Sequence, residues 1–198
     1  MSQAFHLRRT RSQSKKQVII ASNDIRPKVR EAACRILIEE VAQRTGLSWK
    51  TSDKWPASKG TVIALALSAS GTLDGKVVPQ RTDKSLPEWK PEGFRIWVEN
   101  KGDQKTIWIV GADDRAVIFR IGELLRKAEM SRGKFVIDDT VDFATSPVYA
   151  LRGHQIGYRN TANSYDAWSV AQYDKYIREL ALFGTNAIEN IPPIRKGG

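Results

Sequence analysis

The chain has 198 residues, of which 41% are hydrophobic and 27% are charged, and its formal net charge is +10. This length and apolar content suit one large domain, or one domain and part of another, and exclude a wholly disordered chain. The single cysteine, Cys34, excludes an internal disulfide and a cysteine-based zinc cluster, and His6 and His154 are too few and too far apart to indicate a metal site.

Residues 1–16, "MSQAFHLRRTRSQSKK", are predicted to form a disordered basic tail. They hold half of the net positive charge and no acidic residue. In the rest of the chain acids and bases are interleaved, and no basic stripe with intervening aromatic residues is present. We therefore expect no nucleic-acid partner, and a basic nucleic-acid-binding α/β module remains the alternative reading of the charge.

The sequence carries no pattern typical of membrane insertion. The tail has the charged start of a signal peptide without the apolar segment that would follow it. The longest apolar run, "TVIALALSA" (61–69), is too short to cross a bilayer. We expect no membrane partner, and the sequence leaves the localisation and the oligomeric state open.

The segment after the tail predicts a strand followed by a helix. "KQVIIAS" (16–22) is a β-branched run suited to a buried strand. Asn23 or Asp24 can cap a helix with Pro27 in its first turn, and apolar residues then repeat at helical spacing until Gly46. One face of this helix is expected to lie on a sheet.

Further strands are predicted in the middle of the chain. "LSWKTSD" (47–53) and "GTVIALALS" (60–68) have strand composition, and the second is apolar enough to be central. Residues 71–93 show little periodicity and predict a long loop. "FRIWVEN" (94–100) and "KTIWIVGA" (105–112) predict a hairpin, with one buried face because Phe94, Ile96 and Val98 alternate with Arg95, Trp97 and Glu99.

A second amphipathic helix is predicted over residues 115–133, with Asp113 and Asp114 at its start and Gly133 at its end. The "GADD" turn resembles a phosphate-binding turn, but two acids would repel an anion, so we interpret it as a helix cap. "KFVIDD" (134–139) predicts another strand. The chain to this point indicates an α/β layer, in which helices pack on a sheet.

The last part of the chain predicts a strand, a loop, a helix and a second strand. "SPVYALRGHQIGYRN" (146–160) is a strand candidate that follows a proline. Ser169 and Gln172 resemble a capping box for the helix "VAQYDKYIRELALF" (170–183). "TNAIENI" (185–191) begins the next strand. This order is typical of a parallel α/β barrel or of a doubly wound sheet.

The order of these parts resembles the front of certain glycoside hydrolases. "GADDRAVIFRIGELLRKAEMSRGKFVIDD", then "SPVYALRGHQIGYR" and "YIRELALFGTNAIENIP", is similar to the α-glucuronidase (family 67) and β-hexosaminidase (family 20) types. In these enzymes a non-catalytic α/β domain precedes a (β/α)8 barrel. The resemblance implies that residues 17–144 are that domain and that residues 145–198 are the first β/α unit and second strand of a truncated barrel. The loop "YRNTANSYDAW" favours the α-glucuronidase type over a hexosaminidase.

The resemblance also implies where a sugar pocket would form. Active sites of this architecture lie at the carboxyl ends of the barrel strands, and the catalytic carboxylates of these families come from later strands. We therefore expect a chain without catalytic residues, cofactor or metal that is inactive alone. Its parent would hydrolyse O-glycosyl bonds in polysaccharide breakdown, would bind carbohydrate through the missing barrel, and would belong to families that are often exported.

Six residues are the predicted substrate contacts of this chain. Arg152 matches an "RG" arginine that contacts sugar hydroxyls in hexosaminidase-like enzymes, and a guanidinium suits paired oxygens or a uronate. Trp168 could offer a stacking face. The six positions lie near the ends of the two predicted barrel strands: Arg152, His154, Tyr158, Arg159, Glu189 and Asn190.

Other readings of the same residues stay open. Arg152 could instead pair with an acid at the domain boundary, and His154 and Tyr158 could be core or loop residues. A complete small α/β enzyme would have to use Asp113, Asp114 or Glu189, but the sequence shows no nucleophile with a base and no glycine-rich phosphate loop.

Overall fold

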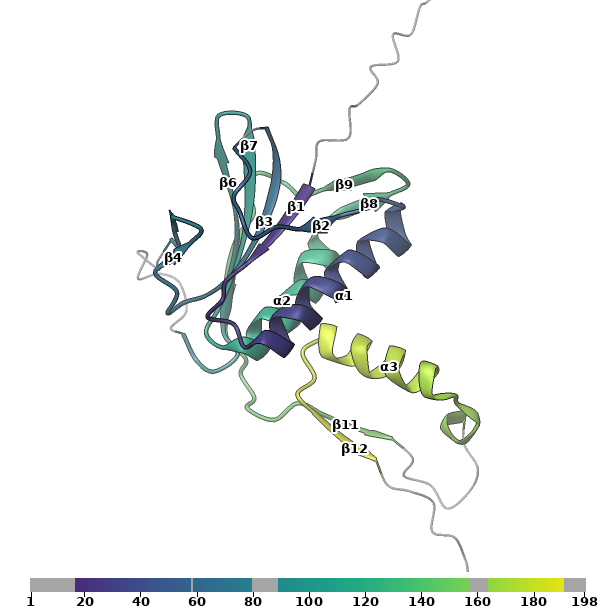
Figure 1. Ribbon diagram of the computed structural model, residues 1–198. Coiled ribbons are helices and arrows are strands. Elements are labelled where there is room, and N and C mark those ends of the chain that lie inside the picture. Colours follow the sequence, from purple (N-terminus) through teal and green to yellow (C-terminus); the bar gives the residue numbers. More distant parts are fainter. Residues whose placement is uncertain (1–16, 58, 80–88, 157–163, 191–198) are drawn as a thin grey trace, which may run out of the picture.

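The chain adopts a mixed α/β fold, which confirms the predicted fold class (Figure 1). The computed structural model describes residues 17–57, 59–79, 89–156 and 164–190, so the predicted basic tail lies outside the described residues. We call residues 17–145 the first unit and residues 146–190 the second unit. No helix of the described residues is both long and apolar enough to span a membrane.

The first unit is built on a six-stranded sheet with the order β10-β6-β7-β3-β1-β2. β1, β2, β3 and β7 run parallel, and β6 is antiparallel to both β7 and β10. The edge strand β10 was not predicted, because its pairing partner β6 is distant in sequence. The bounds of the strands are Gln17–Ala21 for β1, Lys50–Thr51 for β2, Gly60–Leu67 for β3, Phe94–Lys101 for β6, Gln104–Gly111 for β7 and Asp142–Thr145 for β10.

The helix α1 (Pro27–Thr45) follows β1 as predicted, and Gly46 ends it in the left-handed conformation with a φ of 73°. Its start differs from the prediction, because neither Asn23 nor Asp24 caps it. The N-cap is Arg26, whose backbone N–H donates to Asp114 Oδ1 at 3.0 Å. A side chain from the other helix thus accepts a backbone N–H at the start of α1, and sequence spacing could not reveal this contact.

The helix α2 (Asp114–Lys127) begins at the predicted cap, since Asp113 Oδ1 accepts the backbone N–H of Ala116 at 3.0 Å. It ends six residues before the predicted stop at Gly133. A small antiparallel hairpin follows, formed by β8 (Glu129–Ser131) and β9 (Lys134–Val136), and Gly133 makes its turn with a φ of 73°. The glycine therefore serves a hairpin rather than a helix end.

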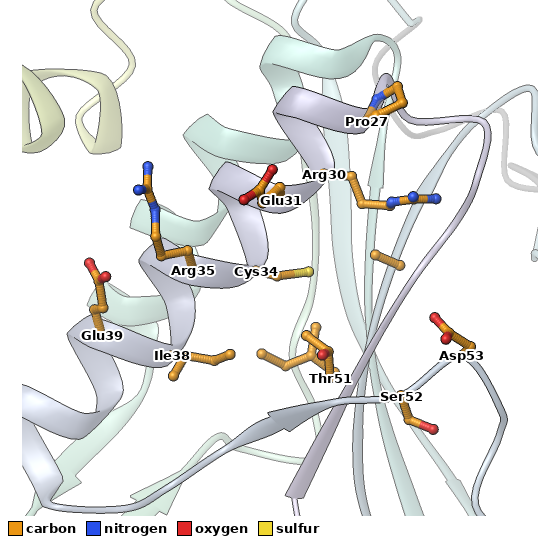
Figure 2. A pocket seen from close by; sticks show the side chains of 12 residues that line it. Pro27, Arg30, Glu31, Cys34, Arg35, Ile38, Glu39, Thr51, Ser52 and Asp53 are labelled. Atoms are coloured by element: carbon orange, nitrogen blue, oxygen red, sulfur yellow. The ribbon is translucent and has the colours of Figure 1, made fainter.

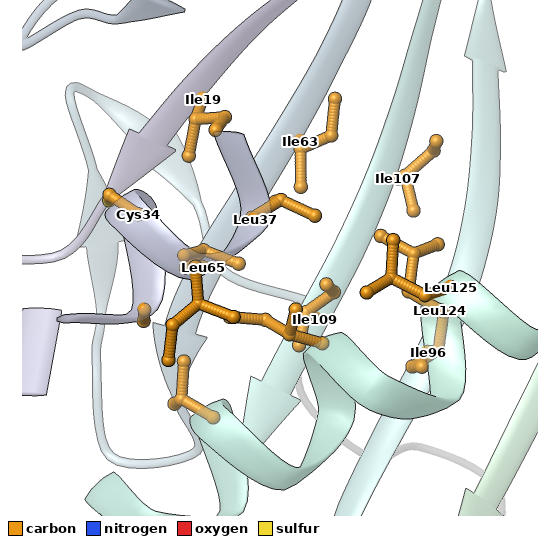
Figure 3. Close-up of a cluster of buried hydrophobic side chains, with 14 of the residues drawn as sticks. Ile19, Cys34, Leu37, Ile63, Leu65, Ile96, Ile107, Ile109, Leu124 and Leu125 are labelled. Carbon is orange, nitrogen blue, oxygen red and sulfur yellow. The ribbon is translucent and has the colours of Figure 1, made fainter. Parts of the chain in front are cut away.

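Both faces of the large sheet are buried. On one face α1 and α2 cover a cluster of aliphatic side chains that includes Ile19, Leu37, Ile63 and Ile107 (Figure 3). On the other face Trp97 stacks on Trp108 with ring centroids 5.8 Å apart.

The predicted single buried face of residues 94–100 is therefore wrong. Part of the cover on the second face comes from residues 71–79, where β4 (Thr72–Leu73) and β5 (Lys76–Val77) form a short hairpin and Leu73 and Val78 are buried.

The second unit is a parallel β-α-β arrangement packed beside α2 (Figure 1). Its strands are β11 (Gly153–Ile156) and β12 (Ala187–Asn190), with the short 3-10 helix Ser164–Ala167 and the helix α3 (Val170–Leu182) between them. The capping box of Ser169 and Gln172 is confirmed. α3 approaches α2 so closely that a Cβ on Gly122 would lie 1.8 Å from the carbonyl oxygen of Leu182.

Candidate functional site

The two strands of the second unit bring Gln155 and Glu189 together. The two residues are register partners, and Gln155 Nε2 donates to Glu189 Oε2 at 2.7 Å. His154 contacts α3, and successive side chains of a strand point to opposite faces. Gln155 and Glu189 therefore lie on the face turned away from α3, where Glu189 is exposed. In a barrel this face lines the interior.

His154 lies on the other face and belongs to an aromatic cluster with α3. Its Nε2 is 2.9 Å from the hydroxyl of Tyr176, and the two rings meet edge to face. A hydrogen bond with Tyr165, followed by burial, raises the pKa of Tyr176. Trp168 makes edge contacts with Tyr165, Tyr173 and Tyr176, so its ring is an integral part of this cluster. The predicted role of Trp168 as a stacking face for sugar stays a prediction.

Arg152 lies at the opposite end of β11, just before its first residue. Its Nε donates to the carbonyl oxygen of Gly184 at 2.7 Å and its Nη1 to that of Tyr149 at 2.7 Å, while its Nη2 pairs with Glu92 of the first unit. These contacts favour the boundary role that the sequence left open. Substrate binding by Arg152 stays a prediction.

The remaining predicted contacts are placed only in part. Tyr158 and Arg159 lie outside the described residues, and Asn190 is described only as the last residue of β12. The structure therefore brings Gln155 close to Glu189 and His154 close to Tyr176. Sequence reasoning missed Gln155, because only the register of β11 against β12 places it beside the acid.

A separate cavity of 590 Å³ lies in the first unit between α1 and the edge of the sheet. Figure 2 shows Arg30 and Cys34 extending from α1 toward Thr51 and Asp53, on and just after β2. Burial raises the pKa of the Cys34 thiol to about 11, so it is protonated at neutral pH and is a poor nucleophile. The sequence did not predict this cavity, because its walls come from a helix and from strand ends distant in sequence.

A neighbouring cavity of 500 Å³ lies between the carboxyl end of β1 and β4 and includes Asp24, Asp53 and Asp74 in its walls. The hydroxyl of the buried Ser22 donates to Asp24 Oδ2 at 3.1 Å, and the backbone N–H of Trp55 donates to Asp74. Within the described parts of the chain, no group of three or more His, Cys, Asp or Glu residues is placed to hold a metal ion.

The acids of the "GADD" turn are occupied by structural hydrogen bonds. Asp113 Oδ1 caps α2, and its Oδ2 accepts the backbone N–H of Glu92 at 2.8 Å. Asp114 accepts from both the backbone and the guanidinium of Arg26. Their contacts support the interpretation of this turn as a helix cap.

Comparisons with known proteins give matches among solved structures alone. No protein-family model matches the chain, and no curated protein sequence matches it. A GH20 exo β-N-acetylglucosaminidase from Vibrio harveyi is similar at a TM-score of 0.55 and 14% identity, over 89% of this chain and 22% of that chain. A GH20 β-N-acetylhexosaminidase from Streptomyces coelicolor A3(2) is similar at 0.57 and 15%, over 89% and 30%.

A third solved structure, a GH138 enzyme targeting pectin rhamnogalacturonan II, is similar at a TM-score of 0.51 and 16% identity, over 88% of this chain and 19% of that chain. At these identities the likeness concerns the fold alone. The chain therefore has a glycoside hydrolase-like α/β fold, and it spans less than a third of each of these structures. The neighbours do not single out the α-glucuronidase type.

Proposed function

We propose that this chain is the amino-terminal part of a glycoside hydrolase-related protein. The first unit would be its non-catalytic accessory domain, and the second unit would begin its (β/α)8 barrel. The observation that carries the proposal is the order of parts, in which a helix-covered sheet is followed directly by the parallel β11-α3-β12 unit. The likeness to solved glycosidases that are several times longer than this chain, which covers 89% of it, supports the proposal.

The surface of the second unit supports this proposal. Seven of the nine exposed large hydrophobic side chains among the described residues lie between residues 148 and 188: Val148, Tyr149, Leu151, Val170, Ile177, Phe183 and Ile188. Parallel sheets are normally buried on both faces, and a two-stranded one leaves both edges unpaired. Further β/α repeats placed against β11, β12 and α3 would cover this apolar surface.

We call the face of β11 and β12 that is turned away from α3 the open face. Its side chains suit a pocket wall rather than a catalytic centre. A glycosidase needs two carboxyl groups, or one carboxyl with help from the substrate, placed across the scissile bond. On the described part of the open face, Glu189 pairs with the amide of Gln155, and no second carboxylate lies opposite it. We infer that these two residues would contact sugar hydroxyls and that the catalytic acids would come from later strands.

The substrate class of the parent protein is the finer part of the proposal. The loop of residues 158–168 favours an α-glucuronidase-like substrate, whereas the GH20 neighbours favour an N-acetylhexosaminide. Both are carbohydrates, and the amide and carboxylate of Gln155 and Glu189 suit the hydroxyls of either one.

Two measurements test the proposal. The purified chain should show no turnover of an aryl glucuronide or an aryl N-acetylglucosaminide, and brisk turnover of either would overturn the accessory role. The reading frame that encodes the chain should continue into further β/α repeats. A stop codon directly after codon 198, together with a chain that is stable and folded throughout, would overturn the barrel assignment.

A further inference from the structure

Glu92 is a buried carboxylate at the boundary between the two units. Its side chain is 4% exposed, and it forms hydrogen bonds or ion pairs with three other side chains. Arg115 Nε of the first unit lies 3.1 Å from its Oε1, and Arg152 of the second unit pairs with its Oε2. Asn186 Nδ2, also of the second unit, lies 3.2 Å from both oxygens. Two of the three partners thus lie across the boundary from Glu92.

The backbone of Glu92 is fixed within the first unit. Its N–H donates to Asp113 Oδ2 at 2.8 Å, and its carbonyl oxygen accepts from Arg120 Nη2 at 3.0 Å. Its φ of 62° lies in the left-handed region, which a residue with a side chain seldom adopts unless its surroundings hold it there. The first unit therefore presents this carboxylate from a rigid position.

The partners of Glu92 in the second unit precede its two strands. Arg152 comes directly before β11, and Asn186 comes directly before β12. The two are also joined to each other, because the backbone N–H of Arg152 donates to Asn186 Oδ1 at 2.9 Å, and Asn186 Nδ2 donates to the carbonyl oxygen of Ala150 at 2.7 Å. One carboxylate consequently holds the amino ends of both strands.

We propose that Glu92 is the positioning residue that sets the second unit on the first, because it clamps the amino ends of β11 and β12 through Arg152 and Asn186. Since the strands are only four residues long, fixing their amino ends also fixes where Gln155 and Glu189 lie. The clamp is a property of the boundary between the two units and does not depend on the proposed function of the chain.

Helices make a further set of contacts between the units. Leu182 packs against Gly122, Arg126 Nη1 donates to the carbonyl oxygen of Leu182 at 2.9 Å, and Arg178 pairs with Glu39 at 2.6 Å. These contacts would still hold α3 if the clamp were lost. Loss of the clamp should therefore loosen β11 and β12 selectively.

Two arginines that contact the same carboxylate provide a matched test. Arg152→Met removes a guanidinium that crosses the boundary, whereas Arg115→Met removes one that stays within the first unit. Amide exchange of the full chain is measured for both variants by mass spectrometry.

We expect Arg152→Met to speed exchange of residues 150–156 and 184–190 by about tenfold or more, because breaking a buried pair leaves an uncompensated charge. Arg115→Met should change it by less than about threefold, because Arg115 is largely exposed and such pairs contribute little. β3 and β7 should keep their protection in both variants. Equal effects of the two substitutions, or no effect of Arg152→Met, would overturn the proposal.

Glu92→Gln and the double variant that combines it with Arg152→Met measure the coupling between Glu92 and Arg152 directly. The double variant should exchange no faster than the faster single variant, because both substitutions remove one interaction. Additive effects would contradict the clamp. If Arg152→Met unfolds the whole chain, Glu92→Gln alone decides, since it removes the charge of the clamp and leaves the bonds that Arg152 and Asn186 make within the second unit in place. A selective gain in exchange around β11 and β12 of about threefold or more supports the proposal, and an unchanged pattern overturns it.

Discussion

The two units differ in how they bury their apolar residues. The first unit has a continuous core on both faces of its sheet, in which side chains such as Ile19, Ile63 and Leu65 are fully buried. In the described residues of the second unit only Ile156 and Leu182 are buried hydrophobic side chains, and Leu182 belongs to the core of the first unit. The first unit can therefore supply its own hydrophobic stabilisation, whereas the second depends on its neighbour.

Truncating one leucine in each unit tests this contrast most strongly. Leu65 is fully buried in β3, and Leu151 of the second unit is 73% exposed. Leu65→Ala should lower the free energy of unfolding by about 3–5 kcal/mol, because it removes buried methyl groups and leaves a cavity. Leu151→Ala should change it by less than about 0.5 kcal/mol. Denaturant titration measures both, and comparable losses would show that the second unit has a core of its own.

Amide exchange of the unaltered chain compares the units directly. We expect the amides of β11 and β12 to exchange about 100-fold faster than those of β3 and β7, which corresponds to about 2.7 kcal/mol of lower opening free energy. The reason is that β3 lies between two parallel neighbours in a doubly covered sheet, whereas within the described residues β11 and β12 pair only with each other. Equal protection of the two pairs of strands would contradict the comparison.

The contact between α2 and α3 can be broken at Gly122. A Cβ there would collide with the backbone carbonyl of Leu182 at 1.8 Å, and a backbone atom cannot rotate away as a side chain could. Gly122→Ala should therefore displace α3 and destabilise the chain by about 1–3 kcal/mol. Gly71→Ala is the control, because a Cβ on Gly71 would meet nothing within 4 Å. Thermal unfolding measures both, and similar stabilities of the two variants would mean that α3 is not seated on α2.

Local signals explain what the sequence could predict of these units. The cap at Asp113 and the capping box of Ser169 and Gln172 are made by residues three positions from their targets, so spacing alone reveals them. The burial of Trp97 was missed because the cover on its side of the sheet comes from residues distant in the chain. The start of α1 was missed because its partner, Asp114, lies 88 residues away.

The same contrast between local and distant contacts applies to the candidate site. The sequence indicated that Arg152 could meet an acid at a boundary, but it could not identify Glu92, which lies 60 residues earlier. Glu189 was predicted as a substrate contact because it lies near a predicted strand end, and Gln155 was not, because its pairing with Glu189 arises from strand register. Predictions from one sequence therefore reached helix ends and strand candidates, whereas the pairing of side chains across units required the fold.

The thiol of Cys34 offers a probe that reports on the first unit alone. Burial raises its pKa from the ordinary 9.0 to about 11. Between these two pH values the unfolded chain loses the thiol proton and the folded chain keeps it, so the free energy of unfolding falls as the pH rises. The fall attributable to Cys34 should be about 1–2 kcal/mol across this window, because each pKa unit corresponds to about 1.4 kcal/mol and the site is only partly enclosed.

Cys34→Ala removes this contribution, so the stability of the variant should decline less steeply from pH 9 to pH 11, measured by denaturant titration at each pH. Because Cys34 lies on the buried face of α1 and the second unit has no cysteine, local opening of β11 and β12 should have the same pH dependence in both proteins. Parallel stability profiles of the two proteins would show that the thiol is not shielded by the first unit's core.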